Sequence, residues 1–355
     1  EEFRFDGFRF DGVTSMLFFN HGLGSVFSSY ADYFDGSVDD DAWVYLQLAN
    51  RLIHDFNPNL LTIAEDVSGM PSVASPVDDC GMGFDYRMAM GVPDFWFRLA
   101  GEVRDEDWSM GSIYYELTNK RPEEKVVSYV ESHDQALVGG KSFFFQLVDK
   151  DVYCGMRCDQ ENLVVERGIA IHKMARLATA ALSAGAYLNF MGNEFGHPEW
   201  IDFPRAENGW SYRHARRQWS LSADQELRFK GLGDFDVELM RILKGFGAFE
   251  SAPVRLKADE SDKVLAFIRS DMMFVFNFHP SKSYVGYGIT VPPVTSWRHF
   301  SDTDEKRFGG EGRIRRAGVY LPIKVHDRGR NEIVDQIQLY LPARTAVVLK
   351  RRIGV

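Results

Sequence analysis

Residues 7–12 read Gly-Phe-Arg-Phe-Asp-Gly, a short apolar run of β type that ends in an acidic residue before a loop. Two later stretches share this format: residues 61–66, Leu-Thr-Ile-Ala-Glu-Asp, and residues 128–134, Ser-Tyr-Val-Glu-Ser-His-Asp. Helical patterns lie between them, as in residues 44–53, whose apolar side chains have helical spacing. Strands that alternate with helices predict βα units and a parallel sheet.

The alternation continues to about residue 221 and then gives way to a second pattern. It predicts strands at residues 84–90, 126–130 and 187–191, and helices at residues 107–118 and 166–184. From about residue 251, strand-like runs follow one another with only turn residues between them, at residues 264–268, 273–278, 289–291, 318–323, 337–341 and 345–349. We therefore expect an α/β domain over residues 1–250, in which residues 226–250 form a helical bridge, and an antiparallel all-β domain over residues 251–355.

The composition is that of a globular protein, since 45% of the 355 residues are hydrophobic and 26% are charged. The length suits two domains. A net charge of −10 argues against a nucleic-acid partner, which would need clustered Lys and Arg. Aromatic residues make up 14% of the chain, and either core packing or stacking on sugars or bases can account for them.

The three cysteines, Cys80, Cys154 and Cys158, are too few for a disulfide framework. Neither the Cys154–Cys158 pair nor Glu194-x-x-His197 has a second ligand pair at the spacing of a metal site, so we expect no metal and no cofactor. No apolar run approaches the roughly 20 residues of a membrane span, and the start of the chain shows no secretory signature. We expect a cytoplasmic, monomeric protein without a membrane partner, and a plastid location stays open.

The acidic strand ends carry the chemistry. Acids that end several parallel strands meet at the carboxyl edge of the sheet. A pair of carboxyl groups there suits glycosyl transfer, in which one ionised carboxylate attacks the anomeric carbon and one protonated carboxyl protonates the leaving oxygen. Arg9 lies two residues before Asp11, on the same face of a strand, where its guanidinium can hold that carboxylate ionised. One such acid alone is more often a helix cap or a loop ion pair, but three in chain order favour a site.

These stretches resemble the signature regions of the alpha-amylase superfamily of glycoside hydrolases and transglycosylases. The first is similar to the fourth-strand motif of that family, which implies that Asp11 is the nucleophile and Arg9 its partner. Glu65 is similar to the fifth-strand general acid/base. His133 and Asp134 are similar to the seventh-strand pair, in which the Asp fixes the hydroxyls of the transferred sugar and the His supports it.

Longer strings narrow the resemblance to the 1,4-alpha-glucan branching enzymes of the eukaryotic type, at residues 11–16, 64–71, 131–139, 189–200 and 275–284. The resemblance implies a (β/α)8 TIM barrel, present here from about strand four to strand eight, and a C-terminal all-β antiparallel sandwich. It also implies that Asp66, Glu194 and Trp200 contribute to substrate binding. One departure is at residues 19–21, Phe-Asn-His, where the family usually carries a further His, and it concerns contacts on the acceptor side.

The implied reaction cleaves an α-1,4-glucan with retention and transfers the chain to a 6-hydroxyl, which forms an α-1,6 branch in glycogen or starch. Retention predicts that the carboxyl groups of Asp11 and Glu65 lie about 5 to 5.5 Å apart. Two alternatives stay open: an α-glucan hydrolase or debranching enzyme of the same superfamily, and a non-catalytic glucan-binding homologue. The intact set of Arg9, Asp11, Glu65, His133 and Asp134 argues against the second.

If Asp11 ends the fourth barrel strand, residue 1 falls just before that strand. The first three βα units, with the early Asp and His motif of the family, and its N-terminal glucan-binding domain would then be absent. We therefore expect a fragment whose open barrel exposes strand edges and apolar side chains. Such a piece would be inactive alone and prone to aggregate.

Overall fold

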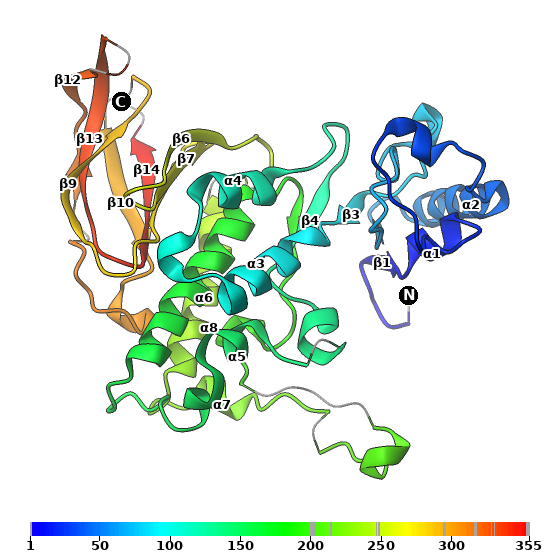
Figure 1. Ribbon diagram of the computed structural model, residues 1–355, viewed down its shortest axis with the longest axis horizontal. Coiled ribbons are helices and arrows are strands. Elements are labelled where there is room, and N and C mark those ends of the chain that lie inside the picture. Colours follow the sequence, from blue (N-terminus) through cyan, green and yellow to red (C-terminus); the bar gives the residue numbers. More distant parts are fainter. Residues whose placement is uncertain are drawn as a thin grey trace. The chain divides into compact units, whose positions relative to one another are not determined.

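The computed structural model describes residues 2–138, 140–198, 204–213, 215–245, 247, 249–293, 296–315, 318–327, 329 and 331–352. The chain divides into two compact units (Figure 1). Unit 1 comprises Glu1–Val92, Thr118–Ser128 and Ser183–Leu188, and unit 2 comprises Pro93–Leu117, Tyr129–Leu182 and Asn189–Val355. The domain boundary expected near residue 250 stays a prediction.

Unit 1 is built on a five-stranded parallel sheet with the strands in chain order. The strands are β1 (Gly7–Phe10), β2 (Leu61–Ala64), β3 (Tyr86–Met88), β4 (Val126–Ser128) and β5 (Ala186–Tyr187). Each pairs in parallel with the next. A sheet that grows in one direction with the sequence is wound like a stretch of an α/β barrel, because a doubly wound sheet reverses its order. The expected α/β class is confirmed.

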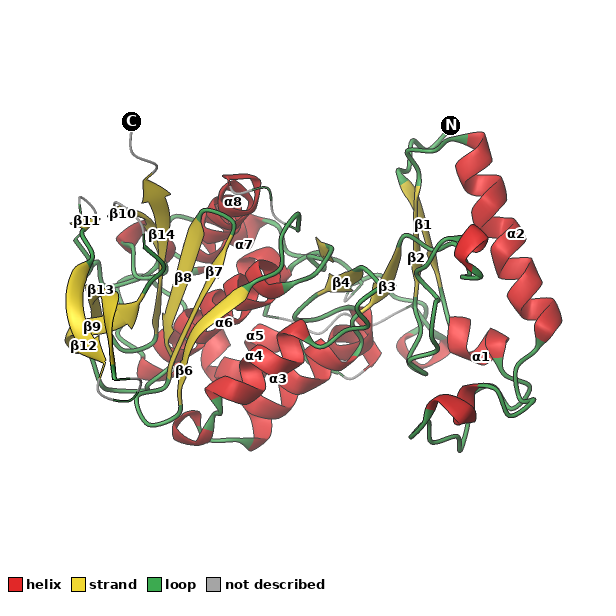
Figure 2. Ribbon diagram, turned by 90° about the horizontal axis from the view of Figure 1, so that it is seen from above, coloured by secondary structure: helices red, strands yellow, loops and turns green. Residues whose placement is uncertain are grey.

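Two helices cover this sheet in unit 1, α1 (Val13–Leu17) and α2 (Asp40–Phe56), beside single turns at Tyr30–Tyr33 and Val77–Asp79 (Figure 2). Helix α2 begins where it does because the Asp39 side chain accepts hydrogen bonds from the backbone N–H groups of Asp41 at 3.0 Å and Ala42 at 3.2 Å. Buried Leu17 and Leu46 pack with Ala64 of β2 in one hydrophobic cluster. This cluster fixes both helices against the sheet.

Most of the helices belong to unit 2. They are α3 (Gly91–Glu102), α4 (Met110–Thr118), α5 (Phe143–Val148), α6 (Leu163–Leu182), α7 (Ser220–Ala223) and α8 (Phe229–Gly245), with short turns at Asp105–Asp107, Asp134–Val138, Asp149–Tyr153, Asn193–Phe195, Ala206–Asn208 and Lys306–Phe308. Helix α6 is buried on most of its surface, and α5 and α8 pack against it. It is the helix expected over residues 166–184, and α8 is the expected helical bridge.

The C-terminal part of unit 2 contains two antiparallel sheets. One has the order β11-β10-β14-β8-β7-β6 and the other the order β12-β13-β9. The strands are β6 (Val254–Asp259), β7 (Val264–Arg269), β8 (Met272–Asn277), β9 (Tyr284–Thr290), β10 (Ser296–Asp302), β11 (Val319–Tyr320), β12 (Ile323–Asp327), β13 (Glu332–Leu341) and β14 (Thr345–Arg352). Side chains of both sheets, among them Val275, Trp297 and Ile337, share one hydrophobic core. The expected all-β sandwich is confirmed (Figure 2).

Several expected strands differ in extent from the observed ones. The strand expected at residues 187–191 keeps only Tyr187, because the chain turns at Gly192, whose φ is +100°. The strand expected at residues 318–323 is divided between β11 and β12, since Pro322 has no N–H to donate to a ladder. Strands β6 and β10 carry charged residues within their apolar pattern, such as Arg255 and Arg298, which hid them in the sequence.

Candidate functional site

A single guanidinium joins the two principal carboxyl groups. Phe10 of β1 stands opposite Ala64 of β2 in the parallel register, so Asp11 and Glu65 leave neighbouring strands side by side. Nη1 of Arg9 lies 3.2 Å from Oδ1 of Asp11, and Nη2 of Arg9 donates a hydrogen bond to Oε2 of Glu65. The strand spacing predicted the contact with Asp11, and the structure adds the one with Glu65.

The two carboxyl groups have different surroundings. The side chain of Glu65 is 15% exposed and that of Asp11 is 81% exposed. Burial raises the pKa of Glu65 above its usual range, and hydrogen bonding with Asp11 adds to this effect, while the Arg9 charge and the Gly12 N–H oppose it. Glu65 is therefore suited to hold a proton that it can donate, and Asp11 is open to a reacting atom.

Asp66 supports the loop that follows β2. Its carboxylate is buried and accepts hydrogen bonds from Oγ1 of Thr14 at 2.6 Å, from Oγ of Ser68 at 2.7 Å and from the Gly69 N–H at 3.1 Å, with Nη1 of Arg87 at 3.6 Å. These contacts suit a group that braces the loop beside Glu65. The substrate contact expected of Asp66 stays a prediction.

His133 and Asp134 form a pair in unit 2. Nε2 of His133 lies 3.2 Å from Oδ1 of Asp134, and Oγ of Ser132 donates to Oδ2 of Asp134 at 3.1 Å. Asp134 opens a π-helical turn, Asp134–Val138, a form of backbone that is frequent at functional sites. Both side chains are partly exposed, so the pair expected from the sequence is present and accessible.

Glu131 is a buried carboxyl group to which the sequence assigned no role. It accepts hydrogen bonds from the N–H of Phe143, at the start of α5, and from Nδ2 of Asn193 at 2.6 Å. Burial raises the pKa of Glu131. Its position two residues before His133 was visible in the sequence, but only its burial and partners reveal that it braces this loop.

Of the last two predicted residues, the structure describes Glu194, which follows β5 in the sequence. Glu194 is half-buried, and its Oε2 accepts a hydrogen bond from the Gly192 N–H at 2.6 Å. Burial lowers the pKa of Arg217, and the charges of Glu131 and Glu194 oppose that shift. Trp200 lies outside the described residues.

Neither a metal site nor a membrane-spanning helix occurs among the described residues. No group of three or more His, Cys, Asp or Glu residues there could hold a metal ion. Cys80, Cys154 and Cys158 are free and exposed. None of the described helices combines the length and the apolar character needed to cross a membrane.

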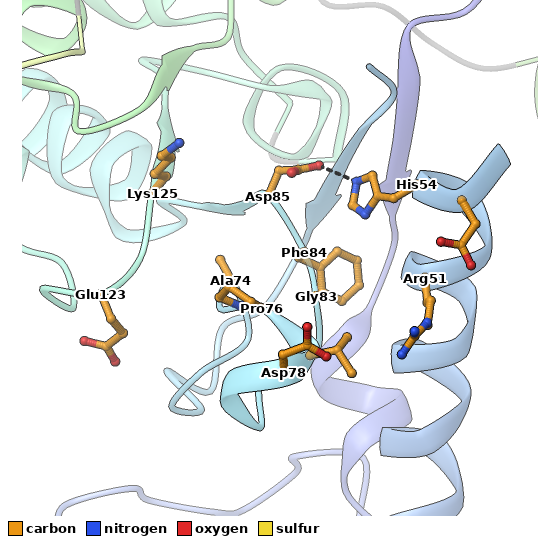
Figure 3. A pocket seen from close by; sticks show the side chains of 12 residues that line it. Arg51, His54, Ala74, Pro76, Asp78, Gly83, Phe84, Asp85, Glu123 and Lys125 are labelled. Atoms are coloured by element: carbon orange, nitrogen blue, oxygen red, sulfur yellow. Dashed lines mark hydrogen bonds and ion pairs between the residues drawn. The ribbon is translucent and has the colours of Figure 1, made fainter. Parts of the chain in front are cut away.

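A cavity of about 520 Å³ lies at the amino ends of the parallel strands, opposite to the ends that Asp11 and Glu65 follow (Figure 3). Asp85 and Lys125 line it and directly precede β3 and β4, and Nε2 of His54, near the end of α2, lies 3.0 Å from Oδ2 of Asp85. In parallel α/β folds, ligands bind at the carboxyl ends of the strands, where Asp11 and Glu65 lie. The candidate site is therefore at the carboxyl ends of the strands and not in this cavity.

Comparison with known proteins identifies relatives over nearly the whole chain. Residues 256–352 match the family described as alpha amylase, C-terminal all-beta domain. The chain is 48% identical over 356 residues to a 1,4-alpha-glucan-branching enzyme of Felis catus, an alignment that covers 99% of this chain and 50% of that protein. The enzyme of the same name from Dictyostelium discoideum is 46% identical, with 99% of this chain and 52% of that protein covered.

Solved structures agree on the fold. An alpha-amylase from H.orenii matches with a TM-score of 0.54 at 14% identity, over 98% of this chain and 61% of that one. An alpha-amylase from Geobacillus thermoleovorans, complexed with acarbose, also matches with a TM-score of 0.54, over 90% of this chain and 58% of that one. In sequence the chain is thus similar to proteins named 1,4-alpha-glucan-branching enzyme, and in fold to alpha-amylases, and it spans about half the length of the curated relatives it matches.

Proposed function

We propose that this chain carries the nucleophile and the general acid/base of a 1,4-alpha-glucan branching reaction. The observation that carries the proposal is the Arg9 guanidinium, which contacts both Asp11 and Glu65, two carboxyl groups in contrasting surroundings. The names of the relatives support α-glucan as the substrate and α-1,6 transfer as the reaction.

The first half of the reaction breaks the α-1,4 bond. Glu65 donates its proton to the glycosidic oxygen, and the electron pair of that bond leaves with the oxygen. Oδ of Asp11 attacks the anomeric carbon from the opposite face, which gives a covalent glycosyl-enzyme. The resemblance assigns to Asp134 and His133 the hydroxyls of the sugar being transferred.

The second half forms the branch. Glu65, now ionised, takes the proton from the 6-hydroxyl of an acceptor glucan, and the oxygen of that hydroxyl displaces Asp11 from the anomeric carbon. Two inversions give net retention. The contact of one guanidinium with both carboxyl groups supports a short separation like the one of about 5 to 5.5 Å that retaining enzymes need, and not the wider one of inverting enzymes.

The remaining expectations belong to the same proposal. We propose a monomer in the cytoplasm or a plastid, without a nucleic-acid or membrane partner. The net charge of −10 supports the absence of nucleic acid, and the three free cysteines support a reducing compartment.

A chimera tests the reaction even if residues 1–355 are inactive or aggregate on their own. In the Felis catus relative, the matched half is replaced by residues 1–355, and the product is incubated with amylose. Branching lowers iodine staining with few new reducing ends and creates α-1,6 linkages. If reducing ends accumulate without α-1,6 linkages, the chain supports hydrolysis. If neither changes while the protein is folded, the non-catalytic alternative holds.

A further inference from the structure

Three arginines lie close together in the segment between β5 and α7: Arg213, Arg216 and Arg217. Arg213 and Arg216 are exposed, whereas Arg217 is half-buried. None of them has a role in the reaction proposed above. Because a guanidinium is costly to withdraw from water, the partners that hold Arg217 in place indicate what it does.

The side chain of Arg217 is fixed on the chain that follows β5. Its Nε donates a hydrogen bond to the carbonyl of Met191 at 2.5 Å, and its guanidinium carbon lies 4.9 Å from the centre of the Phe190 ring. Gly192 has a φ of +100°, and a Cβ there would lie 2.5 Å from Nε of Arg217. The backbone of this loop therefore packs directly on the arginine side chain.

A buried histidine fixes the segment that carries Arg217. Nε2 of His197 accepts a hydrogen bond from the N–H of Gln218 at 3.0 Å, and the His197 carbonyl accepts one from Oγ of Ser142 at 3.0 Å. Ser142 also caps α5, since its Oγ accepts from the N–H of Phe145 at 3.2 Å. The segment of Arg217 is thus held to the loop that it contacts, and that loop is held to the start of α5.

The contacts continue from the loop after β5 to the loop of Asp134 after β4. Asn193 donates a hydrogen bond from Nδ2 to the buried carboxyl group of Glu131 at 2.6 Å. The negative charges of Glu131 and Glu194 favour the charged form of Arg217. Glu131 stands three residues before Asp134, at the start of its loop. A displacement of Arg217 would therefore move Asn193 and, through it, the residue that fixes where the loop of Asp134 begins.

We infer that Arg217 is a positioning residue, which holds the loops after β4 and β5 together so that Asp134 faces the sugar being transferred. The inference rests on the proposed function, in which the resemblance gives Asp134 that contact. Arg217 acts through Met191, Asn193 and Glu131 and not on the reacting atoms. Loss of Arg217 therefore misplaces the contact with the transferred sugar and leaves the proton transfer by Glu65 unaffected.

Two substrates separate these effects in the chimera described above. Amylose needs a proton from Glu65, whereas maltosyl fluoride releases fluoride with little need of one. Arg217→Ala should lower kcat/KM about a hundredfold with both substrates, because a misplaced contact slows the reaction with either leaving group. Arg217→Lys keeps the charge but lacks the directed Nε–H, so it should lose about tenfold and melt like the parent. Arg216→Ala, at an exposed neighbouring position, is the matched control and should keep the parent values.

Binding gives a second measurement that needs no turnover. In the chimera carrying Asp11→Asn, titration calorimetry with maltoheptaose should show several-fold weaker binding for Arg217→Ala and for Asp134→Asn. The variant with both of these substitutions should bind no more weakly than the one with Asp134→Asn, because Arg217 then has no carboxylate to place.

Three results would overturn the role of Arg217. The first is kinetic values in both Arg217 variants equal to those of Arg216→Ala. The second is a loss with amylose but not with maltosyl fluoride, which would place the effect on Glu65. The third is an additive loss of binding when Arg217→Ala and Asp134→Asn are combined. If Arg217→Ala does not fold, Arg217→Lys decides. A parent chimera that releases fluoride but forms no α-1,6 linkage rejects the branching reaction alone, and one without turnover leaves the decision on Arg217 to the binding measurements.

Discussion

At the scale of single residues, one arginine forms ion pairs with two acids. The partners of Arg9 are exposed Asp11 and the mostly buried side chain of Glu65. The sequence predicted the first contact from strand spacing. It could not predict the second, which depends on the register between β1 and β2, or the burial that raises the pKa of Glu65.

Removing either carboxyl group in the chimera should abolish turnover. Glu65→Gln lacks an acidic proton to donate and Asp11→Asn lacks a nucleophile. We therefore expect the branching rate of each variant to fall at least about a thousandfold. The measurement is the rate of α-1,6 linkage formation from amylose. Glu123→Gln, an exposed acid before β4, is the matched control and should keep the parent rate. Turnover within tenfold of the parent in Glu65→Gln would show that another group is the acid.

Replacing Arg9 should move the pH dependence as well as the rate. The Arg9 charge lowers the pKa of Glu65 against the raising effects of burial and of Asp11, so Arg9→Met should raise that pKa further. The protonated acid then persists to higher pH, and the alkaline limb of kcat/KM shifts upward while kcat falls. A pH–rate profile of the chimera checks this. A limb that stays in place, or that moves to lower pH, would contradict the assigned roles.

At the scale of elements, strand ends and the loops after them determine the site. The order of the strands was implied by the resemblance to the family, whereas the parallel sheet and the long helices α2 and α6 followed from periodicity. The ends of elements did not: β3 and β5 are only three and two residues long, and the loop at Asp134 is π-helical. Nor does a local pattern of residues reveal the partners of buried Glu131, which are the N–H of Phe143 and the amide of Asn193.

Glu131 should contribute to stability through the start of α5. Glu131→Ala removes the carboxylate that accepts from the N–H of Phe143 and from the amide of Asn193. Each buried group left unsatisfied lowers the free energy of unfolding by about 1–3 kcal/mol. We expect the midpoint of thermal unfolding to fall by several degrees, as followed by circular dichroism of the chimera. Glu123→Ala is the exposed control. An unchanged midpoint in Glu131→Ala would mean that water replaces the carboxylate.

At the scale of the whole molecule, several large apolar side chains of unit 1 are exposed and lie outside its hydrophobic core. Val44, Leu48, Leu52 and Phe56 recur every four residues along α2 and are each at least 50% exposed. Phe8, on edge strand β1, is 51% exposed. An exposed stripe on a helix beside an unpaired strand edge is a surface that associates. The sequence pattern predicted the helices and strands. Only the structure shows which of their apolar faces are not packed against other described residues.

Residues 1–355 alone should therefore aggregate and show no branching activity. Leu48→Lys/Leu52→Lys breaks the apolar stripe without touching the core, so it should lower light scattering on heating relative to the parent chain. Ser112→Lys, at an exposed position of α4 away from the stripe, is a control that should leave scattering unchanged. A parent chain that is monodisperse, melts cooperatively and makes α-1,6 linkages would contradict this expectation.

Trapping the covalent glycosyl-enzyme tests directly whether Asp11 is the nucleophile. The chimera is incubated with a fluorinated maltosyl fluoride, from which fluoride leaves and whose sugar is released slowly, and the digested protein is analysed by mass spectrometry. We expect one maltosyl-type adduct on the peptide that contains Asp11, and none in Asp11→Asn. An adduct on any other carboxylate, or none in a folded chimera that branches amylose, would contradict it.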